Sequence, residues 1–101
     1  MQHFIESTIQ ALRNGTANPR TLAGDLRQLG EQLEAVEAQY ETAPEEEEEL
    51  RLALLQAVRH YQLSLDLLGR YLENPEPELL ERAQEAAVEA TLQLDDLAPD
   101  A

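Results

Sequence analysis

The chain of 101 residues contains no cysteine and no tryptophan, and it has no lysine, since all seven of its basic residues are arginine. The absence of cysteine excludes disulfides, thiol nucleophiles and thiolate metal sites. With one phenylalanine and three tyrosines, the core must be built mainly from leucine and alanine. No run approaches the roughly 18 apolar residues of a membrane span, and the N-terminus does not resemble a secretory signal. We therefore expect a cytoplasmic protein that does not enter a membrane.

Positive charge is scarce, because 21 acidic residues face the seven arginines and give a formal net charge of −14 at pH 7. A chain of this charge is repelled by phosphate, which argues against direct binding to nucleic acid or to an anionic membrane surface. Electrostatic attraction instead favours a basic protein as a partner. Solubility alone explains the same excess of carboxylates equally well.

The composition is rich in leucine, alanine, glutamate and glutamine and poor in β-branched residues, which predicts an all-α fold. The length fits one domain over residues 1–101. We predict an antiparallel helical bundle of three long helices plus a short N-terminal one. The predicted helices cover residues 2–13, 19–41, 44–73 and 75–97.

The helix predicted over 44–73 carries apolar residues around most of its circumference, which indicates several neighbours. Its main apolar stripe has a spacing of three and four residues and consists of Leu50, Leu54, Val58, Tyr61, Leu65, Leu68 and Leu72. Leu52, Leu55 and Leu63 fall on the opposite side. Each leucine contributes roughly 1.5–3 kcal/mol when buried, so we expect another segment or another chain to cover these three.

The two remaining long helices are predicted to pack against this central helix. Residues 19–41 carry a narrow seam at heptad spacing, formed by Leu22, Leu26, Leu29, Leu33, Val36 and Tyr40, which is typical of an antiparallel helical hairpin. Gly30 beside the seam suggests a close approach of another helix. The inner face of 75–97 is rich in alanine and comprises Leu79, Leu80, Ala83, Ala86, Ala87, Ala90, Leu94 and Leu97. Val88 and Leu92 lie off that face and predict a second contact.

Several residues mark the predicted ends of the helices. Gly15 is expected to end the first helix in a left-handed conformation. Asn18 is expected to cap the second helix, with Pro19 at its first position. Asn74-Pro75 should end the central helix and open the last one. Glu45 to Glu49 place five carboxylates at the positive end of the central helix dipole, and we interpret them as a solvated first turn.

No arrangement of residues predicts a catalytic site, a cofactor site or a metal site. His60 has no metal-binding partner one turn away, and we expect it to be a partly buried, hydrogen-bonded residue at an interface; His3 lies in the terminal segment. Glu31, Glu34 and Glu37 repeat the Glu-x-x-Glu spacing with which all-α NTP pyrophosphohydrolases hold Mg²⁺. The second half of that pattern fails, because Leu63 stands three residues before Asp66.

We therefore predict a protein without enzymatic activity, namely a protein–protein interaction module such as an adaptor, small chaperone or regulator. The predicted partner-binding residues are Leu52, Leu55, Arg59, Leu63, Val88 and Leu92. A homodimer is the simplest assembly, because symmetric pairs are the commonest oligomers. One alternative is an acidic regulator that mimics nucleic acid, using the glutamates at 31, 34, 81, 85 and 89. A second alternative is a Mg²⁺-dependent all-α NTP pyrophosphohydrolase.

Overall fold

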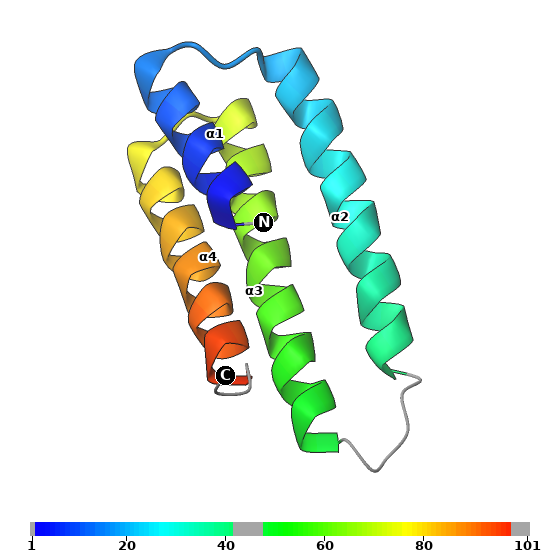
Figure 1. Cartoon of the computed structure of the whole chain (residues 1–101). Coiled ribbons are helices and arrows are strands. Elements are labelled where there is room, and N and C mark those ends of the chain that lie inside the picture. The colour runs from blue at the N-terminus through cyan, green and yellow to red at the C-terminus, as the bar shows by residue number, and fades with distance from the viewer. Residues whose placement is uncertain (1, 42–47, 98–101) are drawn as a thin grey trace.

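The computed structural model describes residues 2–41 and 48–97, and these residues form four α-helices and no strand. The helices are α1 (Gln2–Asn14), α2 (Pro19–Glu41), α3 (Glu48–Glu73) and α4 (Pro77–Leu97). Successive helices run in opposite directions along the chain (Figure 1). The predicted class, an all-α antiparallel bundle of three long helices and one short one, is confirmed.

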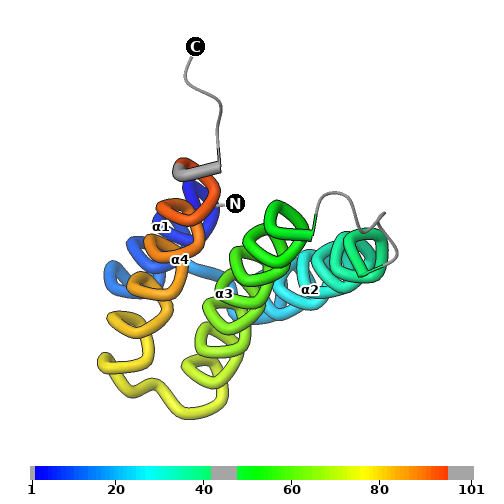
Figure 2. Tube along the Cα trace, turned by 90° about the horizontal axis from the view of Figure 1, so that it is seen from below, coloured from blue at the N-terminus to red at the C-terminus, as the bar shows by residue number. Residues whose placement is uncertain are grey.

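The central position belongs to α3, which lies between α2 and α4 (Figure 2). Helix α4 packs along α3 on one flank, and α2 packs along α3 on the other. The short α1 packs mainly on α4 and touches α3. Within the described ranges, α2 does not pack closely along α4 or α1, so α3 is the element that connects the two sides of the bundle.

The interface between α3 and α4 forms most of the core. The α4 residues buried there are Leu80, Ala83, Ala86, Ala87 and Ala90. Because most of these side chains are single methyl groups, the two helix backbones approach closely. Ser64 of α3 is fully buried in this contact and donates a hydrogen bond of 2.7 Å to the carbonyl oxygen of Ala83. The predicted inner face of α4 is thus confirmed from Leu80 to Ala90; the Leu97 side chain lies outside the described part of the structure.

The seam predicted on α2 also faces α3. Leu22, Leu26 and Leu33 are buried, and the other seam residues, Leu29, Val36 and Tyr40, are half-buried against the core. A narrow apolar seam is sufficient on α2, because α2 packs closely only against α3. Gly30 does not serve a close helix contact, since a Cβ atom added there would meet nothing within 4 Å; that prediction was wrong.

The end of α1 and the start of α2 follow the predicted local chemistry. Gly15 adopts a φ of 70°, and the N–H groups of Gly15 and Thr16 donate to the carbonyl oxygens of Leu12 and Ala11 at 3.3 and 2.9 Å. These two bonds form a Schellman motif, which satisfies carbonyl groups at the helix end. The Asn18 Oδ1 atom then accepts bonds from the N–H groups of residues 20 and 21 at 3.1 and 3.4 Å, so it caps α2.

Helix α4 begins at Pro77, two residues later than predicted. The reason lies in Pro77 itself, because the residue that precedes a proline is disfavoured in the α region. Glu76 is therefore kept out of the helix, and its carbonyl oxygen accepts a bond of 3.0 Å from the N–H of Leu79. The predicted start of α3 at Pro44 lies outside the described residues, as do Thr42, Ala43 and Glu45 to Glu47.

Leu50 was predicted in the core stripe of α3, yet 40% of its surface is exposed. Leu50 lies in the first turn of α3, at one end of the bundle. With 13 residues, α1 extends about 20 Å, whereas the 26 residues of α3 extend about 39 Å. Helix α1 lies along the upper half of the bundle in Figure 1, and the first turns of α3 are at the lower end.

None of the four described helices is long and apolar enough to cross a membrane.

Two glycines inside helices test the helix assignments through their effect on stability. Gly24 of α2 and Gly69 of α3 are helical, and a Cβ atom at either would meet nothing within 4 Å. We expect Gly24→Ala and Gly69→Ala each to raise the free energy of unfolding by about 0.5–1 kcal/mol, measured by urea denaturation. Gly15→Ala is the control and should lower it, because φ is positive there. A loss of stability at both helical glycines would contradict these helix assignments.

Ser64 tests the close contact of α3 with α4. Ser64→Ala removes one buried hydrogen bond and should cost about 1 kcal/mol of unfolding free energy. Ser64→Leu forces a large side chain between two closely packed backbones and should cost about 1–3 kcal/mol more. Thermal and urea unfolding measure both effects. If the leucine variant were as stable as the parent, the α3–α4 contact could not be as tight as described.

Candidate functional site

Between residues 51 and 72, six positions of α3 are exposed, and they lie along one line of the helix. Their spacing is 4, 3, 4, 3 and 4 residues, which is the spacing of a coiled-coil seam. We name this line the α3 stripe; it consists of Leu52, Gln56, Arg59, Leu63, Asp66 and Arg70. Every other position in this range is at least half-buried.

The stripe is the side of α3 that the other helices leave uncovered. Leu52 precedes Tyr61 by nine residues, about two and a half turns, so the two side chains point to opposite sides. Tyr61 is buried, and its hydroxyl forms a hydrogen bond of 2.8 Å with Thr91 of α4. On the opposite side, Leu52 and Leu63 are 48% and 44% exposed. These two leucines are therefore the apolar part of an unoccupied helix face.

Leu55 does not belong to this surface, although it was predicted to bind a partner. Its exposure is only 5%. Leu55 follows Arg51 by one helical turn, and the Arg51 Nη1 atom donates a bond of 3.4 Å to the carbonyl oxygen of Glu41 at the end of α2. This side of α3 therefore faces α2. Leu55 is covered within the chain, and the prediction for it is corrected accordingly.

Val88 and Leu92 lie on α4, away from the α3 stripe. Leu92 is 53% exposed and follows Ala83 by nine residues, so it points away from the side of α4 that contacts α3. Val88 is half-buried and lines a hollow that also includes Arg13 of α1. The six predicted partner-binding residues are thus divided among the core, the α3 stripe and the outer side of α4. Only Leu52, Arg59 and Leu63 share one line.

The charged residues of the stripe have both signs. Asp66 Oδ2 forms an ion pair with Arg70 Nε at 3.1 Å, as the i,i+4 spacing predicts. Arg59 lies one turn before Leu63 and is exposed. The predicted partner-binding residues did not include Gln56, Asp66 and Arg70, which share the stripe. The sequence does contain a signal for them, because the heptad spacing of Leu52 and Leu63 continues through these polar positions. A search for apolar residues alone does not detect it.

A hollow of about 480 Å³ opens between α2 and α3 next to the stripe. Three carboxylate side chains line it, Glu34 and Glu37 from α2 and Asp66 from α3. Arg27 and Gln62 also line it, together with Leu26, Gly30 and Leu65. The hollow therefore combines an excess of negative charge with an apolar base.

The negative charge of the molecule is unevenly distributed. Residues 1–30 contain three arginines and two acidic residues, whereas residues 31–101 contain four arginines and nineteen acidic residues. Glu81, Glu85 and Glu89 line the hollow near Arg13, and Glu34 lines the hollow near Asp66. Of the glutamates proposed for nucleic-acid mimicry, Glu34 on α2 therefore borders a different hollow from Glu81, Glu85 and Glu89 on α4.

His60 occupies the interface between α3 and α4, as predicted. It is half-buried, and its Nδ1 atom lies 2.9 Å from the carbonyl oxygen of Gln56 and 3.0 Å from Gln93 Oε1 of α4. Because both neighbouring atoms are oxygens, Nδ1 carries the hydrogen. His60 therefore has a structural role, because its ring links α3 to Gln93 of α4. His3 is exposed on α1.

Carboxylates do not gather into a metal site in the part of the chain that the structure describes. No group of three or more His, Asp or Glu side chains is arranged to hold a metal ion there. Glu31 and Glu34 are exposed on α2, and Glu37 is half-buried. Of the acidic run 45–49, only Glu48 and Glu49 are described; both are exposed, and Glu48 Oε1 lies 3.9 Å from Arg51 Nη2.

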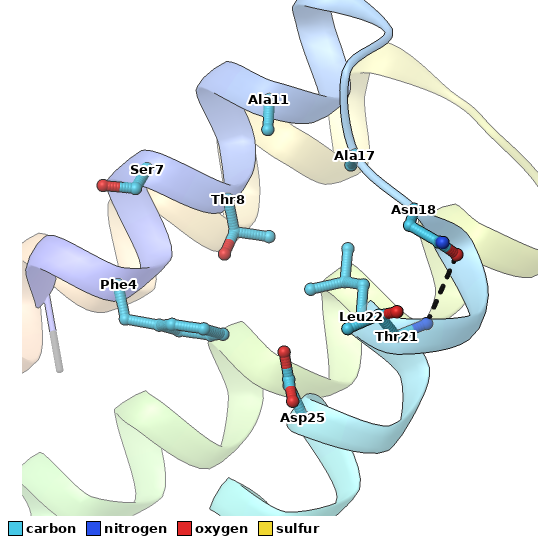
Figure 3. Close-up of a pocket in the computed structure, with 9 residues that line it drawn as sticks. All are labelled: Phe4, Ser7, Thr8, Ala11, Ala17, Asn18, Thr21, Leu22 and Asp25. Carbon is cyan, nitrogen blue, oxygen red and sulfur yellow. Dashed lines mark hydrogen bonds between the residues drawn. The ribbon is translucent and has the colours of Figure 1, made fainter.

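A second apolar surface is a cleft of about 300 Å³ between α1 and α2 (Figure 3). Phe4 extends from α1 toward α2, and Leu22 and Asp25 face it from α2. The other lining residues are Ser7, Thr8, Ala11, Ala17, Asn18 and Thr21. Most of the wall is apolar, and its polar groups are hydroxyls, one amide and the Asp25 carboxylate. The cleft exists because α1 and α2 are joined by a short linker and do not pack on each other.

Comparison with known proteins does not assign a family. No protein-family model matches the chain, and searches of the curated proteins and of the solved structures return no significant match.

Proposed function

We propose that the chain is a non-catalytic protein–protein interaction module that associates through the α3 stripe, with the homodimer as its simplest form. The observation that carries the proposal is the uncovered side of α3. The central helix of the bundle has two packed flanks, and between them lies a seam of six exposed residues with two half-exposed leucines. A seam of this spacing is the surface that a further helix uses for packing.

The strength of such an association follows from the size of the apolar contact. Covering a half-exposed leucine contributes roughly 1 kcal/mol, and a symmetric pair covers four of them. Association itself costs about 4–15 kcal/mol in lost freedom of motion. The leucines alone therefore give a weak, reversible complex. Packing of the arginine side chains and charge pairing must supply the remainder, and detection requires subunit concentrations up to about 1 mM.

The predicted alternatives receive less support. A basic partner would be attracted to carboxylates, yet the stripe carries Arg59 and Arg70 against one carboxylate, Asp66. A nucleic-acid mimic needs rows of carboxylates on one face, and Glu34 borders a different hollow from the glutamates of α4. A pyrophosphohydrolase needs a cluster of carboxylates for Mg²⁺, and the described residues do not form one. The cytoplasmic location stays a prediction.

The mass in solution tests the proposal directly. We expect the parent chain to reach about twice its monomer mass of 11.4 kDa as the concentration rises toward 1 mM, measured by sedimentation equilibrium or light scattering. Leu63→Glu places a charge in the centre of the stripe and should return the mass to 11.4 kDa, with unchanged helical circular dichroism.

The matched control is Leu92→Glu, because it adds the same charge at another exposed leucine that lies away from the stripe. This variant should associate as the parent does. If the parent chain remained monomeric over the whole range, or if both variants lost association equally, the stripe would not be the binding surface.

Ionic strength separates self-association from attraction to a basic partner. Two copies with a charge of −14 repel each other, and raising salt from about 10 to 150 mM shortens the Debye length from about 30 to 8 Å. The homodimer should therefore tighten several-fold over this range, as followed by sedimentation equilibrium. Attraction between opposite charges weakens with salt instead. A homodimer that dissociated as salt increased would contradict this expectation, because attraction between opposite charges would then outweigh the repulsion between the two acidic chains.

A further inference from the structure

We infer that the stripe binds a second copy of the same chain in the antiparallel direction, with Leu63 near the two-fold axis and Arg59 of each copy at the carboxylates beside Asp66 of the other. This inference rests on the proposed function and adds the identity, direction and register of the partner helix. It depends on the order of charges along the stripe and on the hollow next to Asp66.

The order of charges favours the antiparallel direction. Arg59 lies four residues before Leu63, and Asp66 lies three residues after it. When a second copy runs in the opposite direction about a centre near Leu63, each arginine meets the aspartate of the other copy. In a parallel pair, Arg59, Asp66 and Arg70 would each face its own equivalent. Such like-charge contacts disfavour that arrangement.

The hollow beside Asp66 provides a place for the arginine. Asp66 Oδ2 already pairs with Arg70 of its own chain at 3.1 Å, which leaves Oδ1 for a second donor. Glu34 and Glu37 line the same hollow from α2, so an incoming guanidinium group meets three carboxylates. Arg27 is the one basic residue that lines it. A guanidinium group has five N–H donors, and this geometry suits several carboxylate oxygens at once.

The symmetry of the pair is consistent with this placement. A two-fold axis that relates antiparallel helices puts the α2 flank of one copy on the same side as the α2 flank of the other. Asp66 lines the hollow on the α2 flank, and it follows Arg59 by seven residues, so the two lie within about 20° of the same line along α3. Both partners of the ion pair therefore lie on the same side of the interface.

Introduced cysteines determine the direction, because the chain has no cysteine of its own. We expect Leu63→Cys to cross-link efficiently with a short bis-maleimide, since the two copies of residue 63 lie near the axis. Gln56→Cys and Arg70→Cys should each fail alone, because equivalent residues lie about 15–27 Å apart along the helices. A mixture of these two variants should cross-link. Leu92→Cys on α4 is the control for random collision.

Asp66→Arg gives a second, independent readout. It lowers the net charge from −14 to −12, so charge repulsion alone predicts a tighter dimer. Loss of the pairing with Arg59 predicts the opposite, and we expect association to weaken at least tenfold. The double variant Arg59→Glu with Asp66→Arg restores the parent charge and exchanges the pair, so it should associate more tightly than Asp66→Arg alone, while Glu34 and Glu37 keep it weaker than the parent. Circular dichroism confirms that each variant remains helical.

The outcomes separate this inference from the proposed function. Efficient cross-linking of Gln56→Cys and Arg70→Cys alone would show a parallel pair and overturn the inference, while the interaction module would stand. A dimer whose affinity rises in Asp66→Arg would overturn the register in the same way. A parent chain that stays monomeric, with no cross-link above the Leu92→Cys control, would remove both proposals.

Discussion

The arrangement of this protein depends on one geometric constraint, which is that α3 packs against neighbours on two flanks and a third side of it remains uncovered. Helix α4 takes one flank through alanine and serine contacts, and α2 takes the other through leucines. Since α2 and α4 do not pack closely along each other in the described structure, they do not close over α3. The remaining side is the stripe from Leu52 to Arg70. Its exposure is therefore a consequence of how the bundle is assembled.

The distribution of charge adds a second constraint. A molecule with a net charge of −14 repels its own copies wherever carboxylates dominate the surface. Along the stripe, two arginines and one aspartate give a local excess of positive charge. The stripe itself is therefore not acidic, unlike the molecule as a whole. The same feature makes the stripe a poor target for a basic protein.

Much of the fold follows from local sequence chemistry. Periodic apolar spacing located all four helices, and Gly15 and Asn18 set the end of α1 and the start of α2 through a left-handed φ and a capping oxygen. What the spacing could not provide was the coverage of each face. Leu50 and Leu55 illustrate this limit, because both are apolar residues of α3. Leu55 is buried on the α2 flank, whereas Leu50 lies in the first turn of α3 and is 40% exposed. Whether a face is covered depends on the lengths and positions of the other helices. The periodicity within one helix gives no information about these.

The mixed composition of the stripe agrees with a reversible contact better than with a permanent one. If all six positions were leucine, the bundle would expose a continuous apolar band, and such a surface binds other chains with little selectivity. Two leucines spaced eleven residues apart, about 16 Å along the axis, limit the nonspecific attraction. The polar positions between and beyond them then select direction and register, because a wrong alignment leaves an arginine against an arginine. In the homodimer that we propose, apolar area provides only part of the affinity, and the charged residues of α3 select the partner helix.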